Sequence, residues 1–213
     1  MLRHRKRDIA VAVGAAVLAG YVDAIGFLSL GGFFVSFMSG NSTRLAVGLA
    51  GLTPEALIAA RLIASFVVGV MLGTLVGAWL RPMRRAAVLV LVAGLLASAA
   101  LLDAVDIHVA MMFAAAAMGA ENTTFERDGE VSIGLTYMTG TLVKLGQRLA
   151  GVFLGGPKLA WAPYLLLWLG LVSGAVAGAM VLPVAGLAGL WAGVAGALAL
   201  AVAAWLIAGT DAA

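Results

Sequence analysis

The sequence has no cysteine and little charge. Without cysteine there can be no disulfide, thiolate nucleophile or cysteine-based metal site. Charged residues make up 11% of the 213 residues and hydrophobic residues 63%, whereas a soluble domain carries about 25% charged residues. A chain with so little charge cannot cover itself in water, so the composition indicates an integral membrane protein. The net charge of +3 does not indicate nucleic-acid binding, because the basic residues cluster at the ends of apolar segments.

Common catalytic motifs are also missing. The sequence has neither His-Glu-x-x-His nor Gly-x-Ser-x-Gly, and its two histidines, His4 and His108, lie at the ends of different apolar segments. We therefore expect no enzyme activity, no cofactor and no metal site, although a mechanism that uses carboxylates alone stays open.

One stretch occurs twice. Residues 35–51 align with residues 135–151, and each copy runs aromatic, Met, Ser/Thr, Gly, small polar, then a basic residue four positions after the Gly. The aligned pairs are Met38 with Met138, Gly40 with Gly140, Arg44 with Lys144, and Leu45 with Leu145. We interpret each copy as a loop that breaks inside the membrane and turns into a half-helix.

The repeat extends beyond this motif and predicts an internal duplication. Glycines recur every fourth position in two ladders, paired as Gly69 with Gly170, Gly73 with Gly174, and Gly77 with Gly178; Pro82 pairs with Pro183 in the same way. Gly20 before Asp23 is aligned with Gly119 before Glu121. Small residues at this spacing let helices approach closely in lipid. We expect the ladders to hold the two repeats together, with a homodimer contact as the lesser alternative.

The predicted fold class is an all-α integral membrane protein with six transmembrane helices in an inverted 3+3 repeat. The first repeat covers residues 1–104, with spans at 9–28, 55–80 and 86–102 and a re-entrant motif at 33–51. The second covers residues 105–213, with spans at 107–124, 159–182 and 184–208 and a re-entrant motif at 133–151. Because three spans per repeat is an odd number, the second repeat enters from the opposite side.

Charge predicts the orientation. With the N-terminus inside, Arg3 to Arg7 and the Arg81 to Arg85 cluster lie inside, and the acidic turn that begins at Asp103 lies outside. This is the distribution that the positive-inside rule favours, so both termini are expected in the cytoplasm. A cleaved signal peptide at the N-terminus is the alternative, but the apolar run continues to Leu28 and further apolar segments follow.

The two helix breaks are the predicted binding site. Irregular backbone at membrane depth survives only beside protein or a watery cavity, and a helix start offers free N–H groups with partial positive charge. The small polar residues at the breaks either only cap the helices or also line a pathway. The candidate residues are Ser39, Gly40 and Asn41 in one repeat and Thr139, Gly140 and Thr141 in the other.

Charged residues lie close to these breaks. Arg44 and Lys144 come one turn into the half-helices, where a cation opposes the helix dipole. Either they attract an anionic or polar solute, or they pair with the carboxylates of the preceding spans, Arg44 with Asp23 and Lys144 with Glu121. Release of such a pair on protonation would couple protons to transport, which we state as a hypothesis. Asn122 is a further polar neighbour of the second break.

Four stretches resemble the YoaK-like family of bacterial multi-spanning membrane proteins, a domain of unknown function. They are residues 20–27 (GYVDAIGF), 34–41 (FVSFMSGN), 118–122 (MGAEN) and 137–141 (YMTGT). The resemblance covers essentially the whole chain. It implies a protein of the bacterial inner membrane with about six spans, and it implies no established substrate.

The sequence thus predicts a membrane transporter or channel for a small polar or anionic solute, with the lipid bilayer and that solute as partners. The alternative is a structural or regulatory membrane subunit without a ligand. A cavity between the two breaks favours the first function, and dry packing there favours the second.

Overall fold

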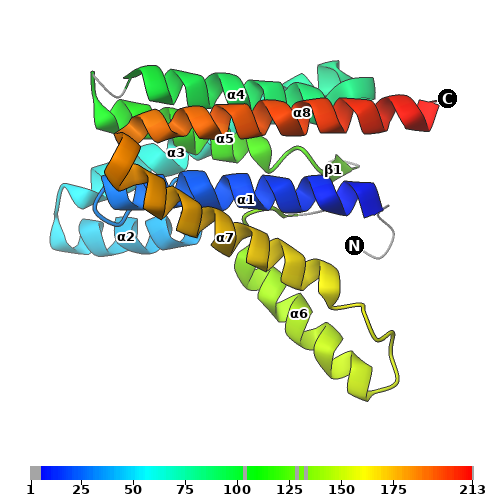
Figure 1. Cartoon of the computed structure of the whole chain (residues 1–213). Coiled ribbons are helices and arrows are strands. Elements are labelled where there is room, and N and C mark those ends of the chain that lie inside the picture. Colours follow the sequence, from blue (N-terminus) through cyan, green and yellow to red (C-terminus); the bar gives the residue numbers. More distant parts are fainter. Residues whose placement is uncertain (1–5, 103–104, 128–129, 132–133, 213) are drawn as a thin grey trace.

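The computed structural model describes residues 6–102, 105–127, 130–131 and 134–212. The basic residues at positions 3–5, Asp103 of the acidic turn and the first residue of the 133–151 motif lie outside the described residues. The described chain is almost entirely helical (Figure 1). Its α-helices are α1 (Lys6–Ser29), α2 (Met38–Gly51), α3 (Glu55–Trp79), α4 (Arg84–Leu102), α5 (Ile107–Glu121), α6 (Met138–Phe153), α7 (Ala162–Ala185) and α8 (Leu190–Ala212). Two 3₁₀ turns, η1 (Arg81–Met83) and η2 (Gly186–Gly189), and a short antiparallel pair, β1 (Glu126–Arg127) with β2 (Glu130–Val131), complete it.

Among the described residues, four helical stretches are long and apolar enough to cross a membrane, which makes this a membrane protein by length and composition. They are Arg7–Ser29, Glu55–Trp79, Arg81–Leu102 and the 48-residue stretch Ala162–Gly209, which contains both α7 and α8. The chain turns back between α7 and α8 at η2 (Figure 1). α5 has only 15 residues, about 22 Å of helix, against roughly 30 Å of hydrocarbon. The count of six spans therefore stays a prediction.

Helix packing follows the same pattern in the two halves of the chain. α1 of the first half packs against α7, α5 of the second half packs against α3, and α4 packs against α8. The short helices also match, since α2 packs on α3 and α6 packs on α7. The helices of each half thus pack mainly against helices of the other half. The start of α1 and the end of α8 lie at the same end of the molecule (Figure 1).

The glycine ladders make the contacts between the halves, as expected. A Cβ added to Gly69 would overlap the carbonyl oxygen of Ala116 on α5, and one added to Gly174 would overlap that of Val17 on α1. Here the sequence alignment was wrong by one helical turn: Gly174 takes the place of Gly69, an offset of 105 residues, whereas the sequence paired Gly69 with Gly170. A ladder with a glycine every fourth residue looks the same after a shift of four, so sequence alone does not set its register.

Several predicted helix ends also differ. Pro183 was expected to close a span, but it lies inside α7, which continues to Ala185. Its missing N–H leaves a carbonyl one turn earlier without its usual donor. The reversal comes instead at Gly186, whose φ of 57° suits glycine. The residue that precedes α3 is Pro54.

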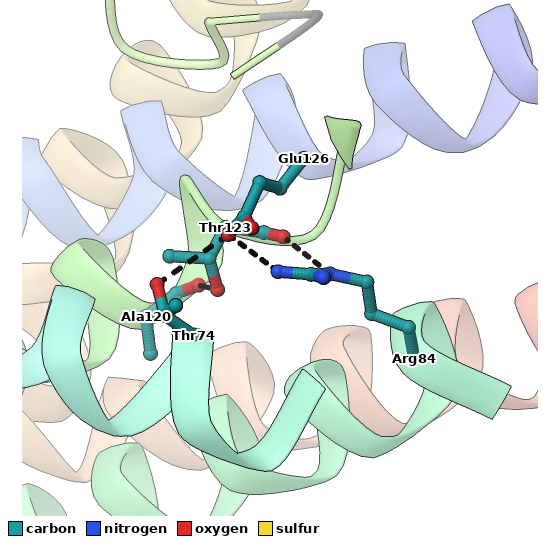
Figure 2. Close-up of polar contacts among 5 residues, drawn as sticks. All are labelled: Thr74, Arg84, Ala120, Thr123 and Glu126. Carbon is teal, nitrogen blue, oxygen red and sulfur yellow. Dashed lines mark hydrogen bonds and ion pairs between the residues drawn. The ribbon is translucent and has the colours of Figure 1, made fainter. Parts of the chain in front are cut away.

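Ion pairs fasten the end of the molecule where α1 and α4 begin. Asp8 of α1 pairs with Arg85, and Arg84 pairs with Glu126 of β1. Figure 2 shows Arg84 reaching from α4 toward the turn after α5, where the hydroxyl of Thr74 also donates to Glu126 at 3.4 Å. Glu126 is thus tied to α3 and α4. Arg85 lies beside the start of α1, which is the arrangement that the predicted orientation requires.

Candidate functional site

The two motifs line one cavity of about 300 Å³. Each motif contributes the same four positions, a hydroxyl residue, an aromatic residue, a Met and a second hydroxyl residue. These pairs are Ser36 with Thr136, Phe37 with Tyr137, Met38 with Met138, and Ser39 with Thr139; Gly140 and Phe66 of α3 complete the lining. None of these described lining residues is charged. Three predicted site residues, Ser39, Thr139 and Gly140, therefore lie together at the cavity.

Asp23 and Asn122 hold the loops that lead into the motifs. The Oδ1 atom of Asp23 accepts hydrogen bonds from the backbone N–H groups of Val35 at 2.9 Å and Ser36 at 2.7 Å. In the other half, Oδ1 of Asn122 accepts from the N–H of Thr136 at 3.4 Å and from its hydroxyl at 3.1 Å. Asn122 is thus the counterpart of Asp23, at the offset of 99 residues that also relates Gly119 to Gly20.

Asn41 braces the first motif. Its fully buried side chain accepts a hydrogen bond from the backbone N–H of Phe34 at 3.0 Å and donates one to the carbonyl oxygen of Phe34 at 2.6 Å. This pair of bonds fixes the loop that precedes α2. Asn41 therefore does not line the cavity, and its counterpart Thr141, which is also buried, does not line it either. Gly40 lies against the rings of Phe34 and Phe37.

We expect Asn41→Ala to destabilise the protein by about 2 kcal/mol, because the partly buried N–H and carbonyl groups of Phe34 would both lose their partner. Thermal unfolding of the purified protein in detergent measures this. Ser42→Ala is the matched control, since the exposed Ser42 hydroxyl bonds only to the carbonyl of Met38 one turn back. Equal unfolding temperatures for the two variants would show that the Asn41 bonds do not hold the loop.

In the described structure, some backbone N–H groups in the first turns of the two half-helices have no acceptor. α2 starts at Met38 and α6 at Met138, and neither has a side-chain hydrogen bond at its N-terminal cap. The interpretation that the small polar residues only cap these helices is therefore wrong. Within the described residues, the backbone N–H groups of Ser39, Thr139 and Gly140 have no acceptor. These donors are available at the cavity.

The basic residues lie away from the cavity. The guanidinium of Arg44 stacks on the ring of Phe33, 4.6 Å from its centroid. Gly32 permits this arrangement, because its φ is 96° and an added Cβ would lie 2.6 Å from the guanidinium. Lys144 is exposed on α6. Neither predicted ion pair forms: Asp23 bonds to backbone, and no cation approaches Glu121 within the described part of the chain.

The sequence interpretation assigned no site role to seven residues that line the cavity: Ser36, Phe37, Met38, Phe66, Thr136, Tyr137 and Met138. Ser36 and Thr136 align at the same offset of 100 residues as the rest of the motif, so the repeat itself carried the signal. Phe66 comes from α3 and has no such marker in the sequence.

Comparison with known proteins places the chain among membrane proteins. The sequence profile of a family described as "Protein of unknown function (DUF1275)" matches residues 11–204. The chain belongs to this family. It is similar to "UPF0700 transmembrane protein RA0705" of Rhizobium meliloti (strain 1021), 37% identical over 212 residues, which cover 97% of this chain and 91% of the relative. It is also similar to "UPF0700 transmembrane protein YoaK" of Bacillus subtilis (strain 168), 33% identical over 143 residues, which cover 62% of this chain and 63% of the relative. No solved structure matches the chain.

The DUF1275 match covers both halves of the chain, including both motifs and all cavity-lining residues. It confirms the resemblance that the motif sequences suggested. Both relatives are named as transmembrane proteins, in agreement with the long apolar helices. The DUF1275 description states no function, so the chemistry of the site has to be argued from its residues.

Proposed function

We propose that the protein is a transporter or channel for a small polar solute, which passes between the tips of α2 and α6. The observation that carries this proposal is the cavity to which both motifs contribute the same four positions. Paired breaks of this kind, in corresponding places of two halves, are where secondary transporters bind their substrates. An enzyme would need reactive groups at the cavity, and none of the described lining residues is charged or carries an imidazole.

The chemistry of the cavity favours a solute with a hydrogen-bonding end and an apolar body. The hydroxyl groups of Ser39 and Thr139 and the unpaired N–H groups of Ser39, Thr139 and Gly140 supply donors at two helix starts, whereas the Thr136 hydroxyl is already bonded to Asn122. Both helix starts carry partial positive charge, which favours a polar or anionic group. The rings of Phe37, Phe66 and Tyr137 line the rest. Because Arg44 and Lys144 lie outside the lining, we favour weakly charged solutes over multiply charged anions.

We further propose that the halves form an inverted repeat of three spans each, with both termini in the cytoplasm of the bacterial inner membrane. Two observations support it. α1 packs against α7 as α5 packs against α3, and α4 packs against its counterpart α8. α2 and α6 run from the cavity in different directions (Figure 1). The ion pairs of Arg84 and Arg85 lie near the start of α1, the end that the positive-inside rule assigns to the cytoplasm.

Filling the cavity tests the function. We expect Thr139→Trp to remove solute binding, because an indole would occupy much of the cavity. The measurement is ligand-dependent thermal stabilisation of the purified protein across a panel of small anions, cations and neutral metabolites, followed by uptake of the best ligand into proteoliposomes. Val143→Trp, on an exposed part of α6, is the matched control and should bind normally.

Two outcomes would contradict the proposal. If no solute stabilises the wild-type protein and none is transported by it, the protein is a structural or regulatory subunit instead. Equal uptake by Thr139→Trp and Val143→Trp would move the pathway away from the cavity.

A further inference from the structure

Glu121 is an acidic residue that is buried without a partner in the described part of the structure. It is the last residue of α5 and is fully buried, yet neither carboxylate oxygen has a hydrogen-bond partner. The hydroxyl of Thr124, one turn further on, is also buried and without an acceptor or donor. The other buried polar side chains near this turn are satisfied, because Asn122 bonds to Thr136 and Thr123 bonds to Ala120.

No described cation neutralises Glu121. α5 packs against α1, α3 and α4. Charged residues on these helices have other partners: Asp8 pairs with Arg85, and Arg84 pairs with Glu126. Asp23 accepts two backbone N–H groups, and Arg7 also has a partner of its own. Glu55 and Arg61 lie near the start of α3, whereas the end of α5 lies beside Thr74 near the finish of α3. An ionised carboxylate without donors is very costly to bury, so Glu121 needs a bound proton.

The fold itself does not require a carboxylate here. Since Asn122 corresponds to Asp23, Glu121 corresponds to Val22, which is buried in the apolar core. The same helix position is therefore filled by an aliphatic side chain in one half and by an unpaired acid in the other. An acid that packing does not need is expected to have a chemical role.

The position of Glu121 links it to the cavity. Its neighbour Asn122 accepts both the N–H and the hydroxyl of Thr136, and Thr136 lines the cavity. We propose that Glu121 carries the proton that drives solute movement: it holds the proton while the end of α5 is closed, and releases it to water when that end opens. A shift of Asn122 then changes the cavity wall at Thr136. This inference rests on the proposed function for its transport part only.

The first experiment asks whether the proton is there. We expect the infrared spectrum of the purified protein to contain the carbonyl band of a protonated carboxyl group free of hydrogen bonds, which Glu121→Gln removes. Gln is neutral and has the same shape, so the variant should fold. Glu121→Val is a second variant. It replaces the acid with the aliphatic residue that the other half has at the equivalent position. A wild-type spectrum without this band, or a band that both variants keep, would overturn the proton site.

The second experiment asks whether the proton is used. In proteoliposomes, we expect an imposed pH gradient to drive uptake of the solute by wild-type protein, and Glu121→Gln to lose this response while solute-dependent thermal stabilisation stays. An unchanged response in Glu121→Gln would overturn the coupling role. The infrared band with no transport of any solute would keep the proton site and reject the proposed function, so the two failures are distinguishable.

Discussion

Gly174→Ala is expected to unfold or severely loosen the protein. The added methyl group would overlap the carbonyl group of Val17, which belongs to the backbone of α1 and cannot rotate away. α1 and α7 form the most extensive helix pair of the molecule, so they would have to separate along much of their length. Overpacking of a core costs about 1–3 kcal/mol and occasionally more, and we expect the upper end because backbone meets backbone. Thermal unfolding in detergent measures the loss.

Gly146→Ala is the matched control, because Gly146 is also inside a helix but has open space around its Cα. The Gly146→Ala substitution replaces a glycine inside a helix with alanine, which stabilises the helix by up to about 1 kcal/mol. Gly69→Ala should be as damaging as Gly174→Ala, because Gly69 meets Ala116 in the same manner. If Gly174→Ala and Gly146→Ala unfold at the same temperature, the close contact between α1 and α7 does not exist.

The second large effect is expected at Glu126. Its carboxylate pairs with Arg84 and accepts the Thr74 hydroxyl, and both charged side chains are mostly buried, with 19% of Arg84 and 13% of Glu126 exposed (Figure 2). Glu126→Gln would leave the Arg84 guanidinium buried without its counter-charge. Removing one partner of a buried pair costs about 3–5 kcal/mol. The drop in unfolding temperature of the purified variant measures it.

A double-mutant cycle separates the energy of the Arg84–Glu126 ion pair from the effect of each single substitution. Arg84→Met with Glu126→Gln should recover most of the lost stability, because no unpaired charge is then left in the interior. Arg81→Met is the control for the loss of a nearby exposed cation and should have little effect. A double variant no more stable than Glu126→Gln alone would mean that the ion pair is not the cause.

The repeated motif was the part of the structure that the sequence predicted best. The spacing of the two Met-Ser/Thr-Gly motifs identified equivalent positions, and Ser39 and Thr139 line one cavity at those positions. That the cavity binds a solute stays a prediction. The membrane class and the family followed from composition and from the motif residues, and both are confirmed.

The sequence could not predict features for which several arrangements fit the same residue pattern, or features that depend on contacts between distant parts of the chain. The glycine ladder is unchanged by a shift of four residues, so its register depends on which carbonyl each glycine meets. Arg44 had a carboxylate within reach in sequence but stacks on Phe33, because the backbone N–H groups of the loop already occupy Asp23. Pro183 is tolerated inside α7, where the sequence rule places a helix end.

The two half-helices have unequal support. Gly48 of α2 lies against the backbone of Ala56 at the start of α3, whereas Gly140, Gly146 and Gly151 of α6 face open space. α3 therefore supports α2 at close range, and α6 has no equally close backbone contact at these glycines. If the protein transports a solute as proposed, we expect the second motif to move more than the first.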